Sequence, residues 1–396
     1  MPQLLNWLLV LILLSGCSAF SAKDNAEPPA ELVEFTPTLE IETLWDISLK
    51  GANGKFISIR PVLRDEQLFV AEPDGRVLAV DAASGKRVWK SETGAPLTAG
   101  PGIVGDLVLL GTGEAELIAL ERETGEESWR RRVSSEVLSS PVGESGTAVV
   151  RSIDGRVLGM NAATGETRWS FDRRVPVLTL RGDSSLLIHD GRVLLGFANG
   201  KLVSLALATG NLVWETAIGT PHGRTELERV VDIDADPVLV EGVVYGACFN
   251  DGVAAVSESS GVVLWKRELS THAGLDADWR QLYITDAEDH VWSLDASNGA
   301  TLWQQDVLHA RRLSAPAIIG EYIVVGDYEG YLHWLAQEDG RLLARVRVGN
   351  GRIRIQPLVV DDVVYIFDDK GRLAALRAKP KEPDSPEKAD NPIGFD

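Results

Sequence analysis

The segment DGRVLAVDAASGKRVW at residues 74–89 returns as DGRVLGMNAATGETRW at residues 154–169. Further copies end at Trp214 and Trp265, and weaker ones end at Trp129 and Trp303. A seventh copy keeps Asp339-Gly340 but has Ala344 at the tryptophan position. An eighth begins at Lys370-Gly371 and stops before any tryptophan. Repetition at a fixed period of about 40 residues is typical of an array of identical structural units.

Each unit has the pattern of four short antiparallel strands. Two apolar runs, such as those before and after Asp74-Gly75, flank a pair that supplies the positive φ of a tight hairpin turn. A later Ser-Gly or Thr-Gly pair precedes the strand that carries the tryptophan. Four strands per unit with one large aromatic residue in the last strand describe a blade of a β-propeller. We interpret the tryptophan as a core residue between neighbouring blades rather than a ligand-stacking residue.

The missing eighth tryptophan is found at the other end of the chain. Trp45 lies in Leu44-Trp45-Asp46 and has no repeat of its own before it. A strand at Trp45 that completes the C-terminal blade would close the ring and leave no open radial edge. The sequence therefore predicts an all-β, eight-bladed propeller in which an N-terminal strand closes the last blade, as one domain over residues 41–378.

The N-terminus has the pattern of a secretory leader. Residues 4–14 are apolar except for Asn6, which is too short for a membrane-spanning helix but suits a signal peptide over residues 1–16. Leu14-Ser-Gly-Cys17 resembles a bacterial lipobox, in which the cysteine becomes the acylated first residue of the mature chain. The resemblance to enterobacterial-type lipoproteins implies that Ser18, in place of Asp, favours sorting to the outer membrane over retention in the inner membrane. The alternative is an ordinary cleaved signal with an incidental cysteine, and the lack of Lys or Arg in residues 1–6 departs from the usual pattern.

The two ends outside the repeats are polar and contain proline. Residues 17–40 are expected to form a flexible tether that carries the lipid at Cys17, and residues 379–396 a disordered tail. Three acyl chains on Cys17 would anchor the protein stably to the membrane.

Composition excludes several classes of function. The net charge of the 396 residues is −19, which disfavours nucleic acid and electrostatic attachment to anionic lipid. There are two cysteines, Cys17 and Cys248, so a disulfide framework is excluded, and Cys248 lies in an apolar strand where we expect a buried, inert thiol. The six histidines show no metal-ligand spacing, and we expect neither a metal site nor a catalytic residue.

Two neighbouring connectors between blades are longer than the others. A proline precedes the tryptophan position by 28 residues in five blades, and from tryptophan to the next proline register the connectors usually span 12 or 13 residues. The connector after Trp169 spans 17 residues and the one after Trp214 spans 23. Both join an outer strand to the next inner strand, so we expect them side by side on one face, where loops on a rigid scaffold commonly bind partners.

The composition of these two connectors suits a protein interface. The first contains Leu178, Leu180 and Arg181, and the second contains Asp232 and Asp234 within an acidic stretch. Apolar anchors rimmed by charges are typical of such interfaces. Two alternatives stay open: Leu178 and Leu180 could begin an inner strand and face the core, and Asp232 and Asp234 could form a solvated turn.

Together, these features resemble the BamB family of propeller lipoproteins. The resemblance covers residues 17–378 and depends on the lipobox, the eight PQQ-like repeats and the segments LTLRG at 178–182, TELER at 225–229, DID at 232–234 and EGYLHW at 329–334. It implies a non-enzymatic scaffold in the outer-membrane β-barrel assembly (BAM) machinery, facing the periplasm as a monomer within a hetero-oligomeric complex. It also implies that the chain binds the POTRA domains of the central subunit BamA, and other subunits through BamA. The partner-contact residues of the family match Leu178, Leu180, Arg181, Asp232 and Asp234.

Two other functions remain possible from the sequence. PQQ-type repeats also build quinoprotein dehydrogenases, but one cysteine besides Cys17 cannot form the vicinal disulfide found in many of them, and no cofactor is expected. A propeller that binds a solute or peptidoglycan is the third possibility.

Overall fold

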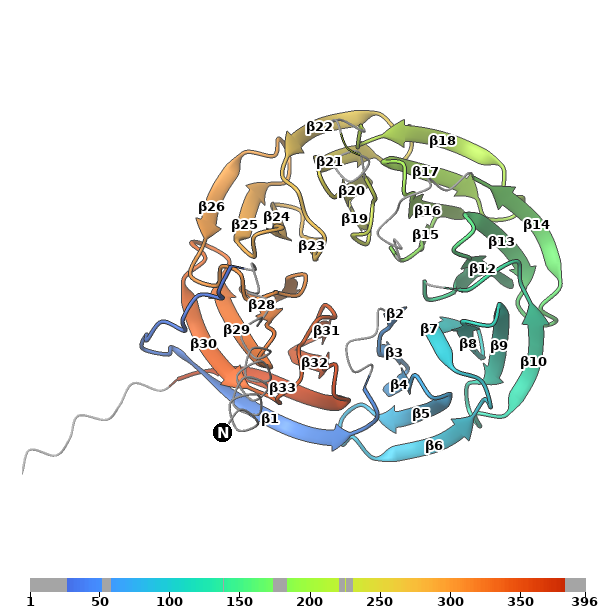
Figure 1. Cartoon of the computed structure of the whole chain (residues 1–396), viewed down its shortest axis with the longest axis horizontal. Coiled ribbons are helices and arrows are strands. Elements are labelled where there is room, and N and C mark those ends of the chain that lie inside the picture. The colour runs from blue at the N-terminus through green and yellow to red at the C-terminus, as the bar shows by residue number, and fades with distance from the viewer. Residues whose placement is uncertain are drawn as a thin grey trace, which may run out of the picture.

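Eight antiparallel sheets follow one another around a ring in the computed structural model (Figure 1). The structure describes residues 27–51, 58–137, 139–173, 184–220, 225 and 231–381. All elements in these residues are strands, and none of the described residues forms a helix that could cross a membrane. The prediction of an eight-bladed propeller is confirmed.

The strands are assigned to blades in chain order, from the axis outward. Blade 1 contains β3 (Val62–Arg64), β4 (Gln67–Ala71), β5 (Arg76–Asp81) and β6 (Arg87–Glu92), and blade 2 contains β7 (Leu97–Val104), β8 (Leu107–Thr112), β9 (Glu116–Glu121) and β10 (Glu127–Arg132), with β2 (Ser58–Ile59) parallel to β7. Blade 3 contains β11 (Val142–Glu144), β12 (Thr147–Arg151), β13 (Arg156–Asn161) and β14 (Thr167–Asp172), and blade 4 contains β15 (Leu187–His189), β16 (Arg192–Gly196), β17 (Lys201–Ala206) and β18 (Leu212–Ala217).

The second half of the ring continues the order. Blade 5 contains β19 (Val238–Val240), β20 (Val243–Ala247), β21 (Gly252–Ser257) and β22 (Val263–Glu268), and blade 6 contains β23 (Gly274–Ala277), β24 (Gln281–Thr285), β25 (Val291–Asp295) and β26 (Thr301–Gln305). Blade 7 contains β27 (Ala317–Ile319), β28 (Tyr322–Gly326), β29 (Tyr331–Ala336) and β30 (Leu342–Arg347), and blade 8 contains β31 (Leu358–Val360), β32 (Val363–Phe367), β33 (Arg372–Pro380) and β1 (Leu39–Ser48).

The N-terminal strand closes the ring as predicted. β1 runs antiparallel to β33, from Leu39 opposite Pro380 to Ser48 opposite Arg372. The eighth tryptophan position is therefore filled by Trp45, whose strand comes from the other end of the chain. This pairing removes the edge that an open propeller would expose.

Burial follows the position of each strand in its blade. All six residues of β8 are buried, because a middle strand is covered on both sides by neighbouring blades. The outer strand β6 buries only Trp89 and exposes most of its other residues. The apolar runs of the repeat are thus the middle strands, and the tryptophan is the one core residue of the outer strand.

Each outer-strand tryptophan joins its blade to the next blade through a hydrogen bond and a ring contact. The indole Nε1 atoms donate to backbone carbonyls of the following blade over 2.7–2.9 Å, at Trp45, Trp89, Trp129, Trp169, Trp214, Trp265 and Trp303. The rings pack on the glycine of the next blade's outer turn. A Cβ added at Gly85 would lie 2.6 Å from the Trp45 ring, so a side chain there is excluded. The interpretation of the tryptophans as core residues agrees with these contacts.

The exception at Ala344 is an inverted pair. In the other seven blades the residue opposite the tryptophan on the neighbouring strand is small: Ala79, Ala119, Gly159, Ser204, Ala255, Ser293 and Ala375. In blade 7 the fully buried Trp334 stands opposite Ala344. The large side chain has moved to the partner strand, which keeps the blade filled. A tryptophan at position 344 would have no outer turn of blade 8 to pack on. The outer strand of blade 8 is β1, which comes from the other end of the chain, so no turn joins it to β33.

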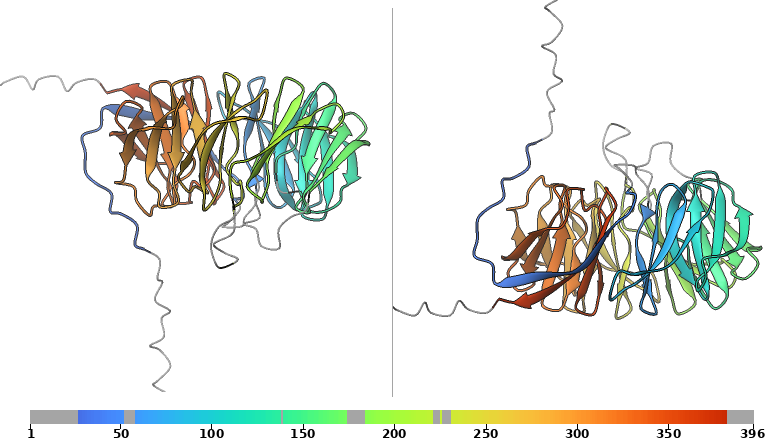
Figure 2. Two further views of the ribbon diagram at one scale, coloured as in Figure 1. Left: turned by 90° about the horizontal axis from the view of Figure 1, so that it is seen from above. Right: turned by 90° about the horizontal axis from the view of Figure 1, so that it is seen from below.

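One face of the ring carries the connectors between blades, and we call it the connector face. Connector residues bond to the turn between the two middle strands of their own blade, as in the pairs Thr93 N to Gly75 O, Ile218 N to Gly200 O and Val348 N to Gly330 O. The ring is a flat disk seen edge-on in Figure 2, with turns along both faces. The connector face therefore also contains all the turns between the second and third strands of each blade.

The described residues before β1 follow the outside of blade 7 (Figure 2). Ala30 N donates to His309 O, and Thr38 N donates to Leu343 O. Arg345 donates to Val33 O and lies over the Phe35 ring, with 5.4 Å between the guanidinium carbon and the ring centroid. Residues 27–38, part of the expected tether, thus contact the ring. Residues 17–26 and most of the expected tail lie outside the described residues.

Candidate partner-binding site

The structure describes part of the predicted site. Leu178, Leu180 and Arg181 lie outside the described residues, as does Cys17. Asp232 and Asp234 are described, together with the residues that flank both long connectors. The site is therefore built here from its two acidic residues and from the ends of the connectors.

The described ends of the two connectors meet at the connector face. Ser185 at the end of the first connector donates its backbone N–H to Asp236 Oδ1 near the end of the second, over 2.6 Å. The first connector leaves blade 3 at Arg173, whose N–H donates to Gly155 O, and the second leaves blade 4 at Ile218, whose N–H donates to Gly200 O. These ends occupy neighbouring sectors of one face, as the connector lengths predict.

Asp236 also fixes this region to the opposite side of the ring. Its other carboxylate oxygen pairs with the guanidinium of Arg60, which precedes the inner strand of blade 1. Blades 1 and 5 face each other across an eight-bladed ring, so this pair spans the axis. The base of the second connector is thus held from two directions.

The motif around Asp232 is embedded between blades 4 and 5. Val231 forms a parallel bridge with Asn199, and Phe249 N donates to Asp232 O over 2.9 Å. The Asp232 side chain is fully buried, and that of Asp234 is half-buried. Ile233 packs over Gly196, where a Cβ would lie 2.3 Å from its methyl carbon. Asp234 is therefore the more accessible of the two predicted acidic contacts.

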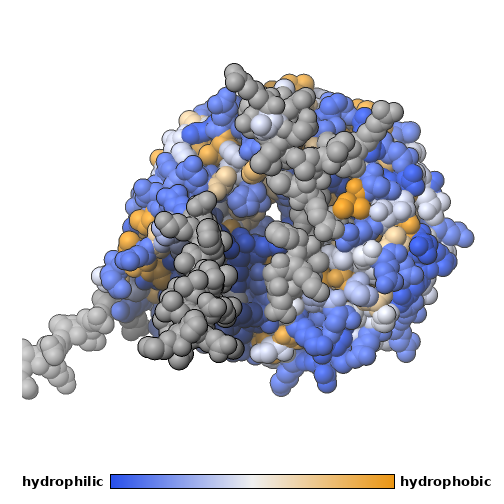
Figure 3. All heavy atoms as spheres, viewed as in Figure 1, coloured by the Kyte–Doolittle hydropathy of each residue, from blue (hydrophilic) through white to orange (hydrophobic). Residues whose placement is uncertain are grey.

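Charged side chains surround these ends in pairs. Glu215 on β18 pairs with Arg173 and, over 2.5 Å, with Lys201. Lys266 pairs with Asp251 over 2.9 Å, and Asp251 accepts the N–H of Thr220. The described surface in Figure 3 is mostly hydrophilic, with small separate apolar areas. Such paired charges orient a rim but supply little binding energy of their own.

Cys248 lies beneath the same region and is buried, as the sequence predicts. Burial raises the pKa of its thiol well above the ordinary range, and the nearby carboxylate of Asp251 raises it further. A thiol with a raised pKa has little thiolate at neutral pH and is a poor nucleophile.

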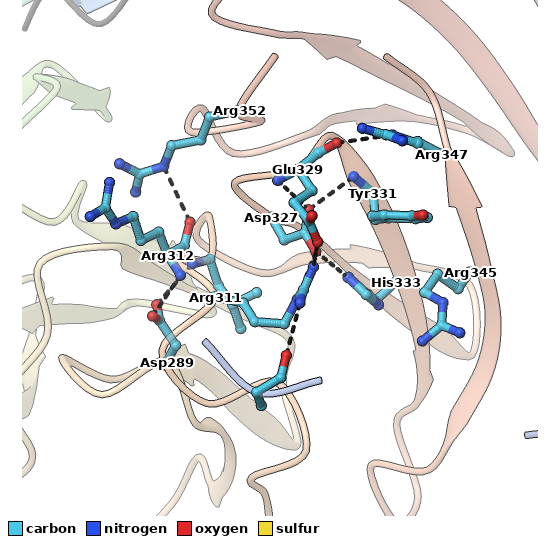
Figure 4. Close-up of polar contacts among 12 residues, drawn as sticks. Asp289, Arg311, Arg312, Asp327, Glu329, Tyr331, His333, Arg345, Arg347 and Arg352 are labelled. Carbon is cyan, nitrogen blue, oxygen red and sulfur yellow. Dashed lines mark hydrogen bonds and ion pairs between the residues drawn. The ribbon is translucent and has the colours of Figure 1, made fainter. Parts of the chain in front are cut away.

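A buried polar network in blade 7 was not predicted from the sequence (Figure 4). Arg311 donates from Nε and Nη2 to Asp327 Oδ2 over 2.9 and 2.7 Å, and from Nη1 to the carbonyl of Ala30. His333 Nε2 lies 3.0 Å from the same Asp327 oxygen. Arg311, Asp327 and His333 are all buried. The network therefore ties the N-terminal segment to the turn of blade 7.

The ionisation of this network follows from its burial. Burial lowers the pKa of His333, so its ring is neutral and donates from Nε2. Burial acts to raise the pKa of Asp327, but the hydrogen bond from His333 and those from Arg311 outweigh it, and the pKa is lowered. Asp327 is thus a carboxylate paired with Arg311, which suits a structural role.

The repeat explains why Asp327 is at this position. Asp286, Asp327 and Asp368 begin the same turn in blades 6, 7 and 8, and each accepts two backbone N–H groups of its turn through Oδ1. The signal for the network was the polar His333 at a strand position that is apolar in other copies, such as Leu78 and Leu158.

Comparison with known proteins identifies the family. The sequence profile described as "Outer membrane protein assembly factor BamB" matches residues 73–305 and 293–380. The chain belongs to the BamB family. The chain is 48% identical to the BamB of Alkalilimnicola ehrlichii, over 93% of this chain and 96% of that protein. It is 46% identical to the BamB of Pseudomonas aeruginosa, over 91% and 94%. The BamB of Salmonella typhimurium is 36% identical over 94% and 98%.

Solved structures agree with this assignment. The crystal structure of BamB from Moraxella catarrhalis has a TM-score of 0.78 and 25% identity, and covers 85% of this chain and 100% of that chain. A quinohemoprotein alcohol dehydrogenase from Pseudomonas putida has a TM-score of 0.64 at 13% identity, covering 90% and 79%. At that identity the likeness to the dehydrogenase shows the fold alone. The BamB family shares its propeller with enzymes, and the relatives named above are assembly factors.

Proposed function

We propose that the protein is a non-enzymatic scaffold for the assembly of outer membrane proteins, held at the periplasmic face of the outer membrane by lipid on Cys17. The observation that carries the proposal is the identity to BamB assembly factors over nine-tenths of the chain. Its partner is a POTRA domain of the central barrel subunit BamA, through which it joins the rest of the complex.

The two long connectors form the binding surface in this proposal. Their described ends are hydrogen-bonded to each other at Ser185 and Asp236, which supports a single continuous surface. Leu178 and Leu180 supply apolar anchors, and Arg181 and Asp234 orient the partner. Asp232 is buried, so it supports the shape of the second connector from below.

Capture by isolated POTRA domains tests the proposal. Arg181→Glu and Asp234→Lys are expected to abolish capture while the melting temperature stays within a few degrees. Lys90→Glu, on an outer strand of blade 1, is the matched charge-reversal control and should bind normally. Capture that persists in both connector variants would exclude this surface.

Anchoring is tested apart from binding. Cys17→Ser should release the protein from the membrane fraction while POTRA capture in solution is unchanged. Retention of the Cys17→Ser protein in membranes would contradict the lipid anchor.

A further inference from the structure

Three potential metal ligands meet on the connector face between blades 6 and 7. Glu288 and His290 come from the turn between β24 and β25, and His309 comes from the connector between β26 and β27. Ala310 N donates to Glu288 O over 3.1 Å, which ties the two segments together. The side chains of Glu288, His290 and His309 each offer a ligand atom, and these atoms lie within 4.8 Å of one another.

Each histidine has one ring nitrogen against a carboxylate. His290 Nδ1 lies 3.0 Å from Asp286 Oδ2 and 3.7 Å from Glu288 Oε2, and His309 Nε2 lies 3.2 Å from Glu27 Oε1. A carboxylate that accepts from one nitrogen fixes the tautomer and leaves the lone pair of the other nitrogen for a metal. Asp286 is itself fixed, because it also accepts the Nε1–H of Trp292 over 2.7 Å.

The remaining nitrogen of His309 supports the same conclusion. His309 Nδ1 is buried and makes no close hydrogen bond among the described residues, although the backbone of Glu288 acts as an acceptor toward the His309 ring. A buried ring nitrogen with only a weak hydrogen bond is poorly compensated for its lost hydration, and a metal ion could bind it in place of its proton. Glu27, Asp286 and Glu288 also make the surroundings negative, which favours a cation.

The donor set selects the class of metal. Two imidazoles and one carboxylate, with water in the fourth position, suit tetrahedral Zn²⁺. Bonds of about 2.0–2.1 Å place tetrahedral ligands about 3.4 Å apart. The two rings are stacked, with centroids 5.1 Å apart and planes at 19°. Binding therefore requires the two rings to separate and the exposed Glu288 to move from the Nδ1 side of His290 toward the ion.

We propose that Glu288, His290 and His309 bind one Zn²⁺ ion, with Asp286 and Glu27 orienting the histidines. The ion would join the turn of blade 6 to the connector that leads into blade 7. Through Glu27 it would also hold the N-terminal segment against the ring. The proposal is independent of the proposed function, because none of these residues belongs to the long connectors.

Isothermal titration of the full mature chain with Zn²⁺ tests the site, using protein without a polyhistidine tag and stripped with chelator. We expect one equivalent to bind. His290→Gln and His309→Gln should each weaken binding by at least about tenfold, a loss that even outer ligands of metal sites produce. His189→Asn, at an exposed position on β15, is the matched control and should bind as the unmodified chain does.

Two further readouts distinguish a built site from adventitious binding. Co²⁺ should give the intense visible absorption of tetrahedral coordination, and His309→Gln should remove it. Without metal, the melting temperatures of the variants should lie within a few degrees of that of the unmodified chain, and Zn²⁺ should raise the melting temperature only where the ligands are intact. Absence of binding at about 1 mM Zn²⁺, or equal affinity in His290→Gln and His309→Gln, would overturn the proposal.

Discussion

The inverted pair in blade 7 gives the sharpest test of how the ring is packed. Trp334 is fully buried opposite Ala344, and its indole N–H has no hydrogen-bond partner among the described residues. Trp334→Ala should therefore cost packing alone. A buried tryptophan covers about 150–250 Å². At about 25 cal/mol per Å², its removal costs at most about 4–6 kcal/mol, close to the roughly 3–5 kcal/mol typical of such truncations.

The reverse change and the double change complete the test. Ala344→Trp alone places two indoles in one space and should destabilise by at least about 1–3 kcal/mol. The double variant Trp334→Ala/Ala344→Trp restores the arrangement of the other seven blades, so its loss should be smaller than the sum of the single losses by about 2 kcal/mol or more. Recovery should be incomplete, because blade 8 has no outer turn with a glycine and a carbonyl to receive the new indole.

Calorimetric melting and urea denaturation of the four proteins measure this coupling. For a chain of this size each kcal/mol moves the melting temperature by no more than about 2–4 °C. The expected order is unmodified chain, double variant, then the two single variants. If the losses of the single variants simply add in the double variant, Trp334 does not replace the missing outer-strand tryptophan and the reasoning is refuted.

Three further predictions concern the turn glycines, the acidic connector and a buried carboxyl. Gly85→Ala should destabilise the protein by more than Gly94→Ala. Both glycines have positive φ, but of the two added Cβ atoms only the one at position 85 meets a tryptophan ring. Equal melting temperatures would contradict the packing of Trp45 on Gly85. Asp232→Lys should lower the melting temperature strongly and Asp234→Lys only slightly. The ammonium group at position 232 would be buried away from water, whereas position 234 is half-buried. Equal losses would contradict this difference in burial. Burial raises the pKa of Asp276 to about 6, so its contribution to stability is complete below pH 4 and is lost as the pH rises through 6, at most about 3 kcal/mol. Asp276→Asn should flatten urea midpoints between pH 4 and 7, and an unchanged pH profile would contradict the shift.

The repeat predicts the architecture because each copy contains the residues that form its turns and its core. Asp74-Gly75 and Ser84-Gly85 determine two turns, and Trp89 determines the core face of the outer strand. The closing strand could be predicted from Trp45 because one tryptophan lacked a repeat. The inversion at Ala344 could not be predicted, because it depends on which residue lies opposite position 344 in the sheet. The repeat pattern alone did not identify Trp334 as the replacement.

The site was only partly predictable for a similar reason. Connector lengths locate an enlarged surface, but they do not give the burial of Asp232, which depends on the bridge between Val231 and Asn199. His290 and His309 are separated in the sequence by a strand and a connector, so they have no recognisable ligand spacing. Only the stacking of turns and connectors on one face brings them together.

The pairing of β1 with β33 imposes an order of events on biogenesis. During synthesis at about 5–20 residues per second, the first strand exists for roughly 20–70 s before its partner is made. Until β33 is present, the residues of β1 have no native partner for the backbone groups that face β33. Completion of the last blade is therefore a checkpoint for full-length polypeptide, and a chain shortened before residue 372 would leave its own first strand without a native neighbour.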